Sequence, residues 1–188
     1  MSRGTLIVLG GRGESAVLYR GLATRMTAAG WRVAVRGDVT ADRSAAQYWV
    51  SNLLQDKVSP GPAILVGSDT GALLALQLAE SGVDGVVVAG LPTGAPVERR
   101  RLRLVGAHAQ GLRPLRLPLL ALHGRDDPVA PLHRALEIYC DTPHSDVVVI
   151  DTSRHHLLDG VPDPTAAAAV TAFLDRVPGR TPVMVESR

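Results

Sequence analysis

The sequence has few aromatic residues and a single cysteine. Phe, Trp and Tyr together make up 3% of its 188 residues, so it offers no visible stacking platform for nucleic-acid bases. Cys140 has no second cysteine to pair with, which excludes an internal disulfide and a CxxC metal or redox motif. No His/Cys/Asp spacing is typical of a metal site, and we expect neither a metal nor a cofactor.

Long apolar runs and a large net charge are also missing. No run approaches the ~20 residues of a membrane span, and we expect no signal peptide, because strand-like residues begin at Leu6. The formal net charge of +2 is too small to indicate a polyanionic partner. We therefore expect a cytoplasmic protein that acts on a small molecule, without a nucleic-acid or membrane partner. A homodimer that completes an open site is the one oligomer we consider.

The residues that are present indicate one α/β domain. Short apolar runs alternate with helical segments, and this predicts a doubly wound, mostly parallel six-stranded sheet with helices on both faces. Strands are expected at 5–9, 31–36, 63–67, 83–89, 118–123 and 146–150. Helices are expected at about 15–29, 43–57, 71–82, 129–141 and 164–177. The domain should span 1–178, with 179–188 as a flexible tail.

Two of these segments carry further expectations. Segment 31–36 alternates apolar and polar residues, which is typical of an edge strand with one wetter face. Segment 92–117 is rich in Gly and Pro around a basic run at 98–103. A solvated helix face is the favoured interpretation of that run, and a short lid that meets an anionic substrate is the alternative.

Segment 63–74 has the pattern of a strand, a sharp turn and a helix. An apolar run ends at Gly67, two polar residues follow, and Gly71 opens an Ala/Leu-rich helix. Small residues on both sides allow a strained turn that lifts one side chain above the sheet, in the pattern G-x-nucleophile-x-G. The lifted residue is then Asp69. Ser68 takes its place only if the register slips, and capping of the helix is the structural alternative for Asp69.

Other polar residues collect where later strands end, at the edge of a parallel sheet where sites form. The candidates are Asp126 and Asp127 after the fifth strand, and His155 and His156 after the sixth. A nucleophile needs a base nearby, and the base needs a third group that orients it. With an aspartate as nucleophile, the imidazole would activate the water that breaks the covalent ester.

These motifs resemble the α/β-hydrolase superfamily over nearly the whole chain. Residues 67–71 match its nucleophile turn, 122–129 look like its acid loop, and 154–159 lie where it places its histidine. The chain order of nucleophile, acid and histidine is the family's. Residues 8–13 resemble its oxyanion loop, with glycine in place of the usual histidine.

The resemblance implies an α/β-hydrolase-like core with the catalytic triad Asp69, His155 and Asp127. The family's G-x-x-D spacing selects Asp127 over Asp126, and the match around Arg154 selects His155 over His156. It also implies that the backbone N–H groups of Arg12 and Thr70 form an oxyanion hole.

The chain also departs from the family. Most members have Ser at the elbow, and Asp resembles the epoxide hydrolase and haloalkane dehalogenase branches, which carry a helical cap between the fourth and fifth strands. That interval is short here and lacks Tyr and Trp, and Thr70 replaces the Trp that usually follows the nucleophile. The core therefore resembles a capless member that lacks the first strands, and a halide site is not expected.

The leading functional hypothesis is a metal-free hydrolase of a small ester, lactone, thioester or epoxide. Two alternatives remain. Asp69 could act as acid and base in a lyase or isomerase, or the chain could be a degenerate hydrolase fold that binds a ligand or partner without catalysis.

Overall fold

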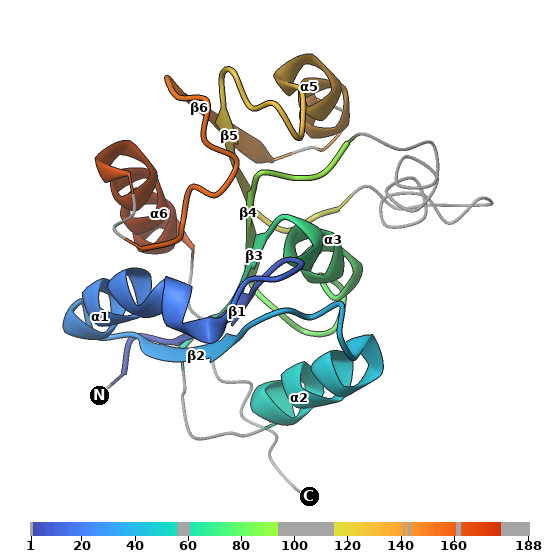
Figure 1. The fold of residues 1–188 in the computed structure, drawn as a ribbon. Coiled ribbons are helices and arrows are strands. Elements are labelled where there is room, and N and C mark those ends of the chain that lie inside the picture. The colour runs from blue at the N-terminus through green and yellow to red at the C-terminus, as the bar shows by residue number, and fades with distance from the viewer. Residues whose placement is uncertain are drawn as a thin grey trace, which may run out of the picture.

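The computed structural model describes residues 2–55, 61–93, 115–140, 142, 144–160 and 163–177. Six strands form one sheet in the order β2-β1-β3-β4-β5-β6 (Figure 1). They are β1 (Thr5–Leu9), β2 (Arg32–Arg36), β3 (Ala63–Ser68), β4 (Gly85–Ala89), β5 (Leu119–Gly124) and β6 (Ser145–Ile150). The predicted doubly wound fold is confirmed. The sheet, expected to be mostly parallel, is parallel at every pairing of these strands.

Helices cover both faces of the sheet. They are α1 (Arg20–Ala28), preceded by the 3-10 turn η1 (Ala16–Tyr19), α2 (Arg43–Gln55), α3 (Thr70–Gln77), α5 (Leu132–Cys140) and α6 (Pro164–Arg176). Figure 1 shows α1 and α6 on one face and α2, α3 and α5 on the other. None of the helices in the described residues is long and apolar enough to span a membrane.

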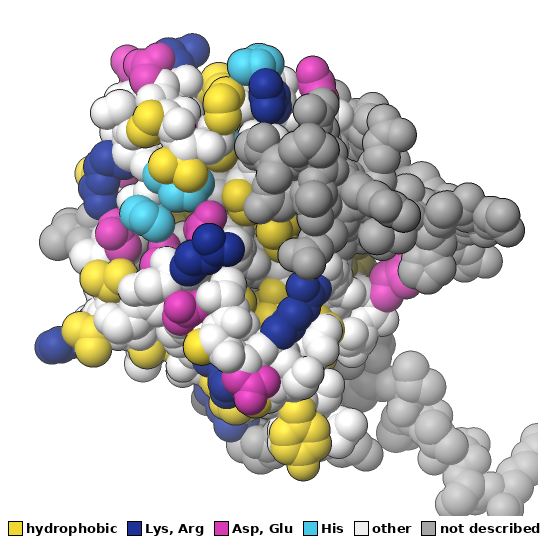
Figure 2. Space-filling model, turned by 45° about the vertical axis from the view of Figure 1, so that its right-hand side comes forward, with side chains coloured by type: hydrophobic (Ala, Val, Ile, Leu, Met, Phe, Trp, Pro, Cys, Tyr) yellow, Lys and Arg dark blue, Asp and Glu magenta, His cyan; other side chains and the backbone are white. Residues whose placement is uncertain are grey.

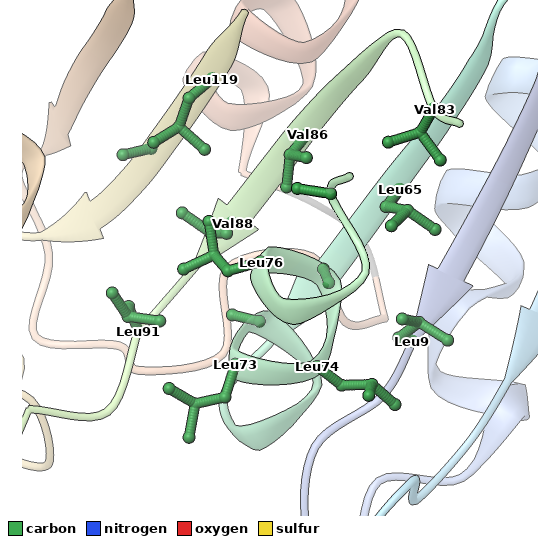
Figure 3. Close-up of a cluster of buried hydrophobic side chains, with 14 of the residues drawn as sticks. Leu9, Leu65, Leu73, Leu74, Leu76, Val83, Val86, Val88, Leu91 and Leu119 are labelled. Atoms are coloured by element: carbon green, nitrogen blue, oxygen red, sulfur yellow. The ribbon is translucent and has the colours of Figure 1, made fainter. Parts of the chain in front are cut away.

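Each face of the sheet has its own hydrophobic cluster. Successive strand residues point to opposite faces, so Leu65 packs with the α3 side (Figure 3) and its neighbour Ile64 with the side of α1 and α6. The inner strands are therefore apolar on both faces, as their continuous apolar runs predict. At the sheet edge, β2 is only half-buried, which confirms the edge position predicted from its alternation.

Two helices are shorter than the sequence predicted. α3 ends at Gln77, because residues 78–82 form turns that end at Gly82, where φ is +91°. α5 begins at Leu132 rather than near 129, because the carboxylate of Asp127 holds the residues after it in a loop. Most of the predicted lid, 94–114, and the tail 179–188 lie outside the described residues, so the lid, the absence of a cap and the tail stay predictions.

Candidate active site

Asp69 occupies a strained turn between β3 and α3. Its φ of 47° and ψ of −123° lie in a region that residues other than glycine rarely adopt. The turn is held from both sides: the N–H of Asp69 donates to the carbonyl of Ala89 at 3.0 Å, and its own carbonyl accepts from Ala72 at 2.9 Å. The Asp69 side chain makes no hydrogen bond that caps α3. The capping alternative therefore does not account for this residue.

Glycines on both sides make the turn possible. A Cβ at Gly67 would lie 2.5 Å from the Cα of Ala72, and one at Gly71 would lie 2.1 Å from the carbonyl oxygen of Leu9. The strand, the helix and the loop after β1 therefore approach closely only because these positions carry no side chain. The G-x-D-x-G pattern thus has a steric reason in this fold.

The structure brings Asp69, His155 and Asp127 together. His155 Nδ1 lies 2.7 Å from Asp127 Oδ2, and His155 Nε2 lies 3.4 Å from Asp69 Oδ1. Asp127 is 4% exposed and His155 8%. The other oxygen of Asp127 accepts from the N–H groups of Val129 at 2.8 Å and Ala130 at 2.9 Å, which fixes the carboxylate that orients the imidazole.

The second oxygen of Asp69 faces Arg12 and Thr70, the two residues predicted to form an oxyanion hole; that role stays a prediction. Asp69 Oδ2 accepts from the N–H of Arg12 at 3.2 Å and from the hydroxyl of Thr70 at 3.1 Å. One oxygen of the carboxylate thus points to the histidine, and the other points to Arg12 and Thr70. This is the arrangement of a carboxylate whose own carbonyl oxygen can become the oxyanion once it has been esterified.

The neighbours of Asp69 and His155 shift their pKa values in opposite directions. Burial opposes ionisation of Asp69, but hydrogen bonds from His155, from the backbone of Thr70 and Arg12 and from the Thr70 hydroxyl outweigh it and lower the pKa of Asp69 to about 2. Burial also disfavours the imidazolium of His155, yet hydrogen bonds with Asp69 and Asp127 raise its pKa above the ordinary 6.5. The resting site therefore holds an ionised Asp69 and favours a protonated His155.

The alternates from the sequence lie elsewhere. Ser68 is 2% exposed, and its hydroxyl donates to Glu14 at 3.1 Å. Asp126 is exposed, whereas Asp127 is buried. His156 Nδ1 lies 2.5 Å from Glu14 Oε1, away from the triad. None of the three takes the place of a triad member in this arrangement.

Glu14 organises a buried polar cluster that the sequence did not reveal. It is 3% exposed and accepts hydrogen bonds from the N–H of Gly11, the hydroxyl of Tyr19 and the hydroxyl of Ser68. Burial and the charge of Glu14 raise the pKa of Tyr19. Glu14 thereby ties the loop after β1 to the elbow and to His156. Its partners come from four separate segments, so only the folded chain shows the cluster.

His123 has a structural role. It is fully buried, with Nε2 2.6 Å from the carbonyl oxygen of Ala130 and Nδ1 3.4 Å from the hydroxyl of Tyr139. Burial lowers its pKa, against the opposing effect of that carbonyl and of Asp127. Across the described residues, no cluster of three or more His, Cys, Asp or Glu side chains could hold a metal ion.

Comparisons with known proteins agree on the fold. No family model and no curated protein matches the sequence. An esterase from Pyrococcus furiosus is similar in structure, with a TM-score of 0.72 and 19% identity over 95% of this chain and 83% of its own. A pyrethroid hydrolase from Sphingobium faniae has a TM-score of 0.68 and 18% identity over 94% and 98% of the two chains. An esterase from a Rhodococcus species has a TM-score of 0.66 and 18% identity over 93% and 91%. With its parallel sheet and the elbow after β3, this chain has the α/β-hydrolase fold.

Proposed function

We propose that the chain is a metal-free hydrolase in which Asp69 attacks a small ester, lactone, thioester or epoxide. The observation that carries the proposal is the position of His155 between two carboxylates, with Nδ1 held by Asp127 and Nε2 facing Asp69. The similarity in fold to esterases and other hydrolases supports the general class.

In the first step the ionised carboxylate of Asp69 attacks the electrophilic carbon of the substrate. A new C–O bond forms on Asp69 while the bond from that carbon to its leaving atom breaks. A protonated His155 donates its proton to the leaving atom, which becomes a neutral hydroxyl group, or a thiol from a thioester. The alcohol or thiol departs from an ester or thioester, whereas the hydroxyl stays on the adduct of an epoxide or lactone. The raised pKa of His155 suits this role, because its two carboxylate neighbours favour the imidazolium over the neutral imidazole.

In the second step a water molecule attacks the carbonyl carbon of the Asp69 adduct. Esterification has removed the charge of Asp69, so the pKa of His155 falls and the neutral imidazole can take the proton of the water. Negative charge then develops on the Asp69 oxygen that already accepts from Arg12 and Thr70. Collapse of this intermediate releases the product as a hydroxyl compound, or as an acid from an acyl substrate, and restores the carboxylate.

Epoxides fit this geometry best among the four substrate classes. The carbonyl oxygen of an acyl substrate would compete with Asp69 Oδ2 for the same donors, whereas an epoxide carbon needs no oxyanion hole in the first step. Protonation by His155 also supplies the acid that epoxide opening requires. His155 would therefore take the role of the acid that the interval between the fourth and fifth strands, which lacks Tyr and Trp, does not offer.

Trapping of the covalent intermediate tests the proposal. Wild-type protein mixed with styrene oxide and quenched within the first turnover should gain the mass of the epoxide on Asp69, while an Asp69→Asn variant treated in the same way should gain none. In the wild-type protein, a single turnover in water labelled with heavy oxygen should place the label in Asp69. If no adduct forms and no label enters Asp69 across a panel of epoxides and esters, covalent catalysis by Asp69 is refuted.

A further inference from the structure

A cavity adjoins the elbow on the side of α2 and α3. Its volume is about 300 Å³, at the lower end of the range for small-molecule sites. Arg12 and Thr70, whose backbone and hydroxyl bind the Asp69 carboxylate, also line the cavity. Asp69 itself is not among the lining residues, so the cavity lies beside the site and shares Arg12 and Thr70 with it.

Two arginines give the cavity a positive charge. Arg12 extends from the loop after β1, Arg43 opens α2, and both side chains are exposed. In the part of the chain that the structure describes, neither guanidinium has an ion pair or a side-chain hydrogen bond. The arginine ion pairs in that part are formed by other arginines. The nearby carboxylate of Asp38 is occupied by the N–H of Gly13 and by Thr40.

The rest of the lining separates into polar and apolar parts. Val39, Leu73 and Leu74 contribute buried apolar surface, while Thr40 and Gln77 add polar groups. Figure 2 shows basic and hydrophobic side chains close together on the same face as histidine side chains. A short apolar segment that ends in an anionic group matches this lining, because a guanidinium binds the paired oxygens of a carboxylate or phosphate with two parallel hydrogen bonds.

We propose that this cavity selects substrates with an anionic end, a carboxylate or a phosphate, which Arg12 and Arg43 bind while the reactive carbon lies at Asp69. The inference rests on the proposed function for its catalytic half. Its binding half stands on the cavity and the two arginines alone. The two halves can therefore be tested separately.

The binding half is tested without turnover. Titration calorimetry with succinate and with glycerol phosphate, which carry no reactive group, distinguishes the two kinds of anion. Binding of at least one should weaken at least tenfold in Arg43→Gln. An Arg25→Gln variant removes another exposed arginine, from α1 on the other face of the sheet, and should bind as the wild type does. If neither anion binds, or if both variants bind alike, the anion site is refuted.

The catalytic half is tested with matched pairs of substrates. Glycidyl phosphate is compared with glycidyl methyl ether, and p-nitrophenyl hemisuccinate with p-nitrophenyl butyrate. The anionic member of at least one pair should have a kcat/KM at least tenfold higher, and Arg43→Gln should reduce this preference through KM while Arg25→Gln preserves it. Equal kcat/KM values within both pairs would refute the selectivity.

The failures of the two proposals are distinguishable. Neutral substrates that form the Asp69 adduct without any preference for anions would leave the hydrolase standing and remove the anion site. Anion binding that depends on Arg43, without any adduct on Asp69, would support the anion site and refute covalent hydrolysis by Asp69.

Discussion

The coupling between Asp69 and His155 makes a quantitative prediction about stability. Asp69→Asn removes the charge of the carboxylate and keeps its shape, and Asn tolerates a positive φ better than most residues. The pKa of Asp69 falls from the ordinary 3.8 to about 2 in the folded protein, which corresponds to roughly 2 kcal/mol. Its side chain is 15% exposed, and solvent screening reduces the expected contribution to about 1–2 kcal/mol.

The pKa shifts of Asp69 and His155 set the pH range in which their interaction stabilises the folded state. A lowered carboxylate pKa stabilises the folded state above the unfolded value, and the effect is lost as the pH falls through the folded value of about 2. A raised histidine pKa stabilises it below about pH 6.5, and the effect is lost as the pH rises through the folded value. The difference in unfolding free energy between wild type and Asp69→Asn should therefore be largest between about pH 4 and pH 6.5.

Urea unfolding of both proteins across this range measures the difference. It should peak inside the window and decline on either side, while an Asp126→Asn control, which changes an exposed carboxylate in the loop after β5, should show no peak. A difference between wild type and Asp69→Asn that stays flat with pH would refute the ion pair between Asp69 and His155, and with it the role of His155 as proton donor.

Three further predictions concern the elbow. Asp69→Gly should unfold with a free energy about 1–3 kcal/mol larger than Asp69→Ala, because both remove the carboxylate but only alanine keeps the strained φ of 47°; equal stability in urea would show that the turn stores no strain. Gly11→Ala should abolish most activity and destabilise the fold by about 1–3 kcal/mol, since its Cβ would lie 2.7 Å from Asp69 Oδ2; unchanged rates would contradict the close approach of this loop to Asp69. In Asp69→Ser, kcat/KM for p-nitrophenyl butyrate should rise as the pH increases through the pKa of His155, because a serine nucleophile needs a neutral base. In the wild type, kcat/KM for styrene oxide should fall over the same pH range, because His155 must be protonated to act as the acid. Two profiles that both rise or both fall would exclude His155 as the acid.

The sequence predicted the fold and the meeting of three side chains because both depend on order along the chain. Strands that alternate with helices place all carboxyl ends at one edge of a parallel sheet. Asp69, Asp127 and His155 each follow a different strand at that edge, so their proximity follows from topology. The choice of Asp127 over Asp126 came from the resemblance alone. The structure adds its physical reason, since Asp127 is the residue whose loop hydrogen bonds orient it toward His155.

Features that depend on side-chain packing between distant segments could not be predicted. Glu14 was visible only as a polar residue after the first strand, and nothing in the sequence places Tyr19, Ser68 and His156 around it. The position of Asp69 Oδ2 at the expected oxyanion donors likewise depends on the path of the loop after β1. Helix ends shifted for a related reason, because side-chain hydrogen bonds and turns decide where a helix begins and ends.

An aspartate at the elbow together with a short interval after the fourth strand raises the question of what would replace a cap if the chain lacks one. In the branches that the elbow resembles, a cap supplies groups that bind the leaving atom and a wall that holds the substrate. In the proposed mechanism His155 supplies the proton for the leaving atom, because two carboxylates favour its charged form until Asp69 is esterified. In the same proposal the cavity beside α2 and α3 would supply the wall, with Arg12 and Arg43 in place of the contacts from a cap. Because the two arginines would bind the anionic end while His155 acts at the reactive carbon, a substrate without an anionic end should have a higher KM and a nearly unchanged kcat. A kcat difference within the matched pairs that exceeds the KM difference would argue against this division of roles.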